Sequence, residues 1–153
     1  KPVKAEMVLG ETKHAAQIQV IDKELPPFFP EGGGAPIPMK DCWRFNTAAY
    51  KIDRLLDLRM VAVAVSRSYQ GKPAAFSWWV DDVLFEEVDR LKKGLLPPDP
   101  DDFEKRRALV RVFDELIINI DRNQSNLLIT KSWAIALIAT DRSWNSAWRV
   151  SGG

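Results

Sequence analysis

The fold is decided by residues 113–138, which read FDELIINIDRNQSNLLITKSWAIALI. The first residues of this stretch are the last part of an apolar stripe with helical spacing. Two short apolar runs, at 127–129 and 133–138, predict a β-hairpin around the turn 130–132. The polar run 121–126 lies between the helix and the hairpin. Helices followed by a terminal hairpin, after a strand-rich first part, favour an α+β fold over a doubly wound sheet.

Two helices are predicted upstream of this stretch. Residues 84–96 carry an apolar stripe with helical spacing, and the prolines of 97–100 end it. A longer helix then begins near Asp101 or Asp102, either of which is a suitable N-cap. Its apolar stripe consists of Phe103, Leu109, Val110, Phe113, Leu116 and Ile117.

The first 80 residues are richer in strands. Ala16, Ile18 and Val20 alternate with glutamines, which predicts one strand. The segment 25–38 contains five prolines and three glycines, which exclude a regular helix and most ladder hydrogen bonds. We therefore expect a long surface loop there.

One helix and one hairpin are predicted in the rest of this part. Apolar residues recur at helical spacing over 45–56, and Asp53 falls on the polar side of that helix. The valine-rich run 60–65, a turn at Gly71 and the run 74–80 then predict a β-hairpin, whose first strand we expect to be buried on both faces.

Composition limits the classes of protein. Of 153 residues, 46% are apolar and 28% are charged, which suits a single globular domain rather than a disordered chain. Lys and Arg number 22 against 21 Asp and Glu, so bulk charge gives no support for nucleic-acid binding. The apolar runs are short and broken by charges, so no membrane span is expected.

The cysteine and histidine content limits the chemistry. Cys42 is the only cysteine, which rules out an internal disulfide and a thiolate zinc cluster, and we expect a reducing, cytoplasmic compartment. His14 is the only histidine and has no nucleophile motif nearby, so we expect a partly exposed structural side chain. The acidic pairs at 81–82, 86–87 and 101–102 are expected at helix starts and on solvated faces.

The polar run carries the clearest chemical signal. Asp121 precedes Asn126 by five residues on a loop that leads into a strand. Such a carboxylate can orient or deprotonate an attacking hydroxyl, and the amide oxygen can hold Mg²⁺ without repelling nucleotide phosphates. The alternative interpretation is a polar turn whose side chains cap backbone groups.

With its flanks, this run resembles the catalytic-loop region of atypical kinases of the HipA-like and phosphatidylinositol 3/4-kinase-like group, in which a D-R-x-x-x-N loop precedes a hairpin. Residues 46–71 are similar to the helix and strands of their small lobe. The resemblance implies a protein-kinase-like two-lobe fold. A small β-rich lobe with one helix would occupy 1–80, and a truncated helical lobe with the catalytic loop and terminal hairpin would occupy 81–153.

The resemblance also implies roles for residues. Asp121 takes the place of the catalytic carboxylate, Arg122 follows it as in the family, and Asn126 takes the place of the metal-binding amide. ATP and Mg²⁺ would be the cofactors, and the γ-phosphoryl group would move to a hydroxyl acceptor. Trp79, in the pair with Trp78, lies where the family's hinge binds adenine.

The chain departs from the family pattern at three places. Ala139 stands where a second metal carboxylate is expected, which leaves Asp141, two residues further on and on the same face of an extended strand. Asn46 takes the place of the helix glutamate. The region in which the family's phosphate-contacting lysine is expected contains no lysine. Lys23 and Lys40, which flank this region, are the near candidates, and we take Lys23 as cofactor-binding.

These departures leave two other classes open. The first is a catalytically inactive, pseudokinase-like module that holds a protein partner through the cleft, the Pro/Gly loop or the tryptophans Trp144 and Trp148. The second is an unrelated α+β domain with a polar turn.

Overall fold

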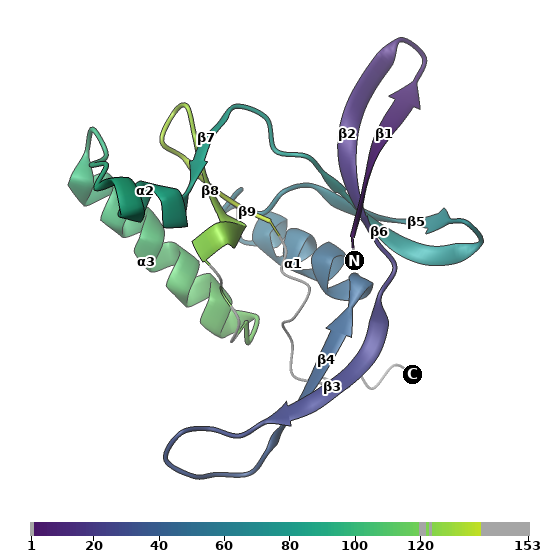
Figure 1. Ribbon diagram of the computed structural model, residues 1–153, viewed down its shortest axis with the longest axis horizontal. Helices are drawn as coiled ribbons and strands as arrows, with labels where there is room; N and C mark the ends of the chain where they lie inside the picture. Colours follow the sequence, from purple (N-terminus) through teal and green to yellow (C-terminus); the bar gives the residue numbers. More distant parts are fainter. Residues whose placement is uncertain (1, 120–121, 123, 139–153) are drawn as a thin grey trace.

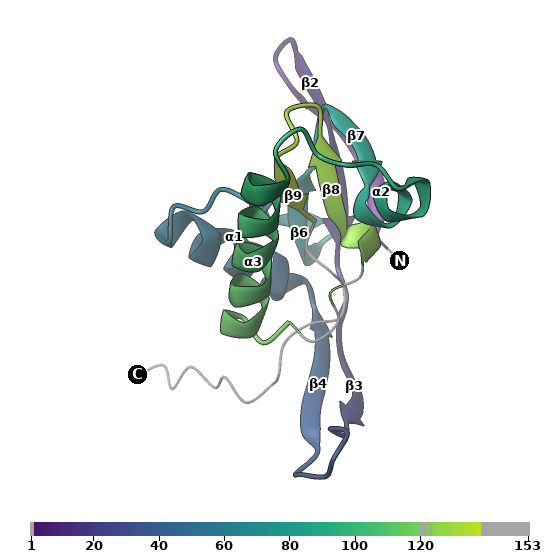
Figure 2. The ribbon, with the colours of Figure 1, turned by 90° about the vertical axis from the view of Figure 1, so that its left-hand side faces the viewer.

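The computed structural model describes residues 2–119, 122 and 124–138. This part of the chain has an α+β fold, with nine strands in three antiparallel sheets and three α-helices. Two hairpins, β1–β2 and β3–β4, project from the body in opposite directions (Figure 1). The helices α2 and α3 and the three-stranded sheet lie on one side of α1 (Figures 1 and 2).

A four-stranded sheet, in the order β1-β2-β6-β5, forms the first layer. Its strands are β1 (Val3–Leu9), β2 (Thr12–Gln19), β5 (Ala64–Tyr69) and β6 (Lys72–Trp78). The hairpin predicted around Gly71 is confirmed, because Gln70 and Gly71 form its turn with φ values of 50° and 75°. Burial on both faces was a wrong prediction: Val63 and Val65 are exposed, since α1 covers only the opposite face.

The helix α1 (Trp43–Leu55) packs against β5 and β6. Its predicted existence is confirmed, and the predicted stripe is right for Ala49, which is buried, and for Ile52, which packs against the core. The stripe is wrong at its end, because Leu55 is exposed and Asp53 is 0% exposed. Oδ1 of Asp53 accepts hydrogen bonds from the backbone N–H groups of Met60 (2.8 Å) and Val61 (3.2 Å). The carboxylate is buried because it receives these donors, which helical periodicity does not reveal.

The strands β3 (Asp22–Phe28) and β4 (Ile37–Cys42) form a two-stranded arm that projects from the body (Figure 2). The prediction of a loop over 25–38 is therefore wrong at both ends. Prolines are tolerated here because both strands are edges, where a missing N–H can face solvent. The register also shifts between Leu25 and Phe28, around the two consecutive prolines.

The third sheet, in the order β7-β8-β9, contains the predicted terminal hairpin. Its strands are β7 (Val83–Glu86), β8 (Leu127–Thr130) and β9 (Ile135–Leu137). The helix predicted from residue 84 begins late, because Phe85 and Glu86 pair with β8 instead. The helix α2 (Glu87–Lys93) follows, and Gly94 ends it in the left-handed conformation with φ 62°.

The helix α3 (Pro100–Leu116) confirms the predicted long helix. Its N-cap is Asp99 rather than Asp101 or Asp102, because the Asp99 side chain accepts a hydrogen bond of 3.0 Å from the N–H of Asp102. Pro100 is well placed at the first helical position, where its missing N–H has no intrahelical partner to lose.

The main core lies between α1, α3 and the three-stranded sheet. The backbones of Met60 and Ala62 bond to Leu137 at 2.7 and 3.1 Å, which joins the segment after α1 to β9. The predicted lobe boundary falls in the segment 79–82, which connects β6 to β7. The core nevertheless combines residues from both sides of it: Ala49, Met60, Val61, Phe103, Val110, Phe113, Ile117, Leu127, Ile129, Ile135 and Leu137.

Candidate functional site

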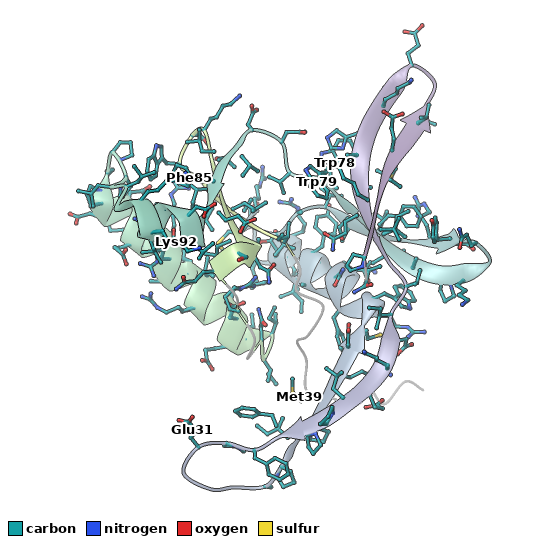
Figure 3. The ribbon with its side chains drawn as sticks, in the orientation of Figure 1. Glu31, Met39, Trp78, Trp79, Phe85 and Lys92 are labelled. Carbon is teal, nitrogen blue, oxygen red and sulfur yellow. The ribbon has the colours of Figure 1, made fainter. Side chains whose placement is uncertain are left out.

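A cavity of about 420 Å³ lies where the four-stranded sheet meets the three-stranded sheet. Two of its walls come from the end of β6 and from β7, which carry the side chains of Trp78, Trp79 and Phe85 (Figure 3). Leu128 of β8 and Ile138, just after β9, add further apolar surface. A concave, mostly apolar space of this size suits a small organic ligand.

Ser77 supplies an unusual polar group to this cavity. The residue is 8% exposed, and its hydroxyl has no hydrogen-bond partner within the described part of the chain. Leaving a buried hydroxyl unsatisfied costs about 1–3 kcal/mol. The hydroxyl oxygen is itself closed to solvent, so a ligand in the cavity would bond to it only after neighbouring atoms shift.

The β1–β2 hairpin holds the two tryptophans. The ring of His14 stacks on Trp78 with centroids 3.5 Å apart and planes 14° apart. Nζ of Lys4 lies 3.9 Å from the ring centroid of Trp79. The backbone N–H of Trp79 also donates to the carbonyl of Ala15 at 3.0 Å, so this wall of the cavity is fixed by β2.

His14 is a structural link, as expected from the sequence. Its Nδ1 lies 2.7 Å from the carbonyl oxygen of Ala15, and its Nε2 lies 2.8 Å from a carboxylate oxygen of Asp81. Asp82 bonds to Lys131 at 2.6 Å. The acidic pair therefore ties the connection 79–82 to both neighbouring sheets.

The polar loop is described in part. Asp121 lies outside the described residues, as do Ala139, Asp141, Trp144 and Trp148. Arg122 is held by Asp114 of α3, with Nε–Oδ2 at 2.9 Å and Nη2–Oδ1 at 2.6 Å. Asn119 donates to the same carboxylate at 2.8 Å. The loop is thus anchored to the end of α3.

Arg122 and Asn126 lie near the cavity without lining it, and Arg122 lines a second pocket of about 530 Å³ together with Asp114 and Gln124. The N–H of Ile138 donates to the carbonyl of Asn126 at 3.3 Å, and Nη1 of Arg122 lies 3.5 Å from the carbonyl oxygen of Ile138. Ile138 lines the cavity together with Trp79. Of the predicted site residues, Trp79 therefore lines the cavity, whereas Arg122 and Asn126 approach it only through their bonds to the backbone of Ile138.

The candidate lysines lie elsewhere. Lys23 is an exposed residue of β3 in the arm and does not line the cavity. Lys40 of β4 pairs with Asp22 at 2.9 Å, and this bond raises the pKa of Lys40 above its ordinary value. Asn46 is buried on α1. Among the described residues, no group of three or more His, Cys, Asp or Glu side chains is placed to hold a metal ion.

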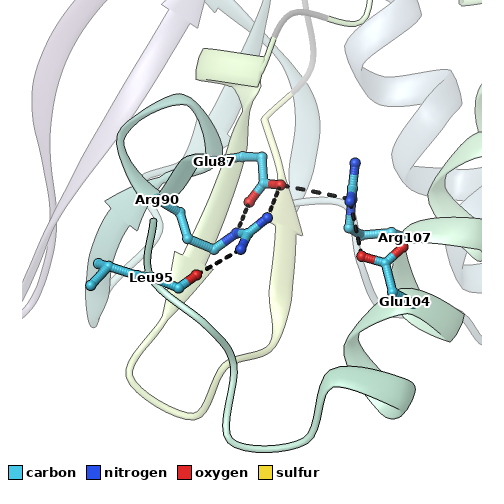
Figure 4. Close-up of polar contacts among 5 residues, drawn as sticks. All are labelled: Glu87, Arg90, Leu95, Glu104 and Arg107. Atoms are coloured by element: carbon cyan, nitrogen blue, oxygen red, sulfur yellow. Dashed lines mark hydrogen bonds and ion pairs between the residues drawn. The ribbon is translucent and has the colours of Figure 1, made fainter. Parts of the chain in front are cut away.

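Glu87 lies at the start of α2, as predicted for this acidic pair, but it is buried rather than solvated. It is 2% exposed and receives two hydrogen bonds from Arg90, of 2.6 and 2.8 Å (Figure 4). Arg90 also donates to the carbonyl of Leu95 at 2.7 Å, and its pair with Glu87 raises the pKa of Arg90. Nε of Arg107 lies 3.7 Å from Glu87. The Glu87–Arg90 pair lies within α2, and the contact of Glu87 with Arg107 joins α2 to α3.

Sequence reasoning missed Ser77 and Asp114. Neither has a local signal: a serine in an alternating strand and an aspartate near a helix end both have ordinary surface interpretations. Their roles depend on which strands and loops lie nearby in space.

A comparison with known proteins found no family model, curated protein or solved structure that matches the chain. None of the described helices has the length and apolar character needed to cross a bilayer. The cavity and the polar loop beside it are therefore the observations that bear on function.

Proposed function

We propose that the chain binds ATP in the cavity between the sheets and acts as a kinase-like phosphotransferase that moves the γ-phosphoryl group to a hydroxyl acceptor. The observation that carries this proposal is the contact between the polar loop and the cavity. Arg122 and Asn126 both bond to Ile138, which lines the cavity. A loop with this residue pattern has its predicted chemical role only beside a nucleotide site.

The cavity has the chemistry that a purine ring requires. The flat apolar ring would lie between Trp79 and Leu128, and the Ser77 hydroxyl would bond to a ring nitrogen or exocyclic amine. Aromatic and aliphatic walls with a few polar groups are typical of such sites.

The loop would direct the reaction. In this proposal Asp121 orients the acceptor hydroxyl and receives its proton, and Arg122, fixed by Asp114, sets the course of the loop. The amide of Asn126 fits Mg²⁺, with Asp141 as the second ligand; bound Mg²⁺ supplies charge neutralisation at the phosphates. Lys23, exposed on the arm, would contact the phosphates only if the arm approached the cavity.

The proposal extends to the fold. The four-stranded sheet with α1 would be the small lobe, and the three-stranded sheet with α2 and α3 would be a truncated helical lobe. The connection 79–82 between them would be the hinge. The support for this assignment is the position of the cavity, which is lined from both sheets and from that connection.

Calorimetric titration with Mg-ATP tests the proposal. We expect binding by the wild type that is lost in Asn126→Ala and Asp121→Ala. Gln124→Ala is the matched control, because Gln124 is an exposed amide in the same turn and does not line the cavity. Thermal melts show whether each variant is folded. Absence of heat at saturating nucleotide, in a folded wild type, would refute the proposal.

Turnover separates an enzyme from an inactive module. With labelled ATP we expect release of the γ-phosphoryl group to water or to an added hydroxyl acceptor, and its loss in Asp121→Ala. Binding without any turnover would instead favour the pseudokinase-like module, whose partner association should depend on Trp144 and Trp148.

A further inference from the structure

The outer edge of β1 is open. β1 is the first strand in the order β1-β2-β6-β5, and within the described residues no strand pairs with its outer side. Five of its seven residues are exposed. Unpaired backbone groups along a strand edge are a template for pairing with another strand.

The side chains of β1 specify which strand fits this edge. Lys4 and Glu6 lie on one face of the sheet, and Val3, Ala5 and Met7 lie on the other. If two copies of β1 pair in antiparallel fashion about a two-fold axis at Ala5, Lys4 of each copy faces Glu6 of the other. Moving the axis to Lys4 or to Glu6 places like charges opposite each other, which is unfavourable. The charges therefore select one register.

We propose that the chain forms a two-fold symmetric dimer in which β1 pairs with β1 of a second copy to give one eight-stranded sheet. The same patch serves both copies, as an isologous interface requires. The proposal does not rest on the proposed function, because none of the β1 residues that pair across the interface lines the cavity, although Lys4 contacts Trp79, which does.

The apolar face of the sheet supports the same register. Through the strand pairings, Ala5 shares its face with Ala16 and Trp78, and Val3 shares it with Ile18 and Phe76. α1 covers the opposite face, which carries Ala75. With the axis at Ala5, Val3 meets Met7 of the second copy, so the apolar face continues across the interface.

The pairing also has a spectroscopic consequence. Nζ of Lys4 lies 3.9 Å from the ring centroid of Trp79 in the single chain. A carboxylate from Glu6 of the second copy would compete for this ammonium. We therefore expect tryptophan fluorescence to change with protein concentration over the range in which the dimer forms.

Sedimentation velocity over micromolar to near-millimolar concentrations tests the proposal. We expect the wild type to approach twice the mass of the single chain. Lys4→Glu and Glu6→Lys each convert both Lys–Glu contacts into like-charge contacts, so each alone should weaken the dimer by about tenfold or more. An equimolar mixture of the two variants restores opposite charges at both contacts and should dimerise again.

Lys13→Glu is the matched control. It makes the same charge change in the neighbouring strand β2, where Lys13 lies opposite Val8 and one strand away from the proposed interface, and should leave the dimer unchanged. Circular dichroism confirms that every variant is folded. A wild type that stays monomeric throughout would overturn the proposal, as would a mixture of the folded single variants that fails to associate.

Discussion

Asp53 holds the segment after α1 against the core. Its Oδ1 accepts from the N–H groups of Met60 and Val61, and the residue is 0% exposed. We predict that Asp53→Ala lowers the free energy of unfolding by about 3 kcal/mol, because two buried N–H groups lose a charged acceptor. Urea denaturation measures this change.

Two variants define the interpretation of that result. Asp53→Asn retains one acceptor oxygen and should cost less than Asp53→Ala. Asp57→Asn is the control, because Asp57 is exposed and pairs with exposed Arg59, and because asparagine tolerates the positive φ of 53° at this position. It should change stability by less than about 0.5 kcal/mol. Equal effects of Asp53→Ala and Asp57→Asn would show that the buried acceptor contributes nothing.

The pair Glu87–Arg90 gives a second residue-scale prediction. Removing one partner leaves the other charge buried, so Arg90→Met should destabilise the fold by about 3–5 kcal/mol. The double variant Glu87→Leu with Arg90→Met should be more stable than Arg90→Met alone, because no unpaired charge remains. Chemical denaturation of both variants compares them. Arg106→Met, at an exposed pair with Asp102, should have little effect.

Among the elements, the arm carries a pH-dependent contact. A hydrogen bond from Lys40, the largest influence, lowers the pKa of Asp22 below its ordinary value of 3.8; a bond from Arg44 acts in the same direction. Because the pKa of Asp22 is lower in the folded state than in the unfolded state, its ionised side chain stabilises the fold at pH values above the unfolded-state pKa. This stabilisation is lost as the pH falls through the folded-state pKa. The Asp22 side chain is 35% exposed, so the effect is screened and below about 1 kcal/mol.

Asp22→Asn tests this linkage. We expect the wild type to be slightly more stable than the variant near neutral pH, and we expect the difference to shrink as the pH falls below 3.8. Urea unfolding across acidic pH measures the difference. Glu31→Gln, at the exposed tip of the same arm, should show no such trend. A difference that grows on acidification would contradict the assignment.

Sequence periodicity predicted the elements whose patterns are long or have a turn signal. The helices α1 and α3 have sustained stripes, and the hairpins closed at Gly71 and at 130–132 have clear turns. Periodicity failed for β7, because the four residues Val83–Glu86 also fit the first turn of a helical stripe. It failed for the arm because prolines exclude central strands but not edges.

The candidate site was predictable only where it is local. Arg122 and Asn126 belong to one loop, so a motif could single them out. Ser77 and Ile138 share a cavity because β6 and the end of β9 meet across the two sheets, which no spacing along the chain encodes. Asp114, which anchors Arg122, is likewise defined by the chain reversal after α3.

For the molecule as a whole, the shared core predicts a single unfolding transition. Ala49, Met60 and Val61 pack with α3 and the three-stranded sheet, so neither part keeps an intact core alone. We expect unfolding curves from far-ultraviolet circular dichroism and from tryptophan fluorescence to coincide. Tryptophans occur in both parts, including Trp43 and Trp133. Two separated transitions would show that the parts unfold independently.

The thiol of Cys42 can report on the junction between the arm and α1. It is the only thiol of the chain, it is 4% exposed, and it lies where the arm joins α1, with Nη1 of Arg44 3.6 Å from its sulfur. A thiol-reactive chromophore can modify it only when that junction opens. The labelling rate in native buffer therefore measures how often the base of the arm opens. It distinguishes local opening of this junction from global unfolding of the chain.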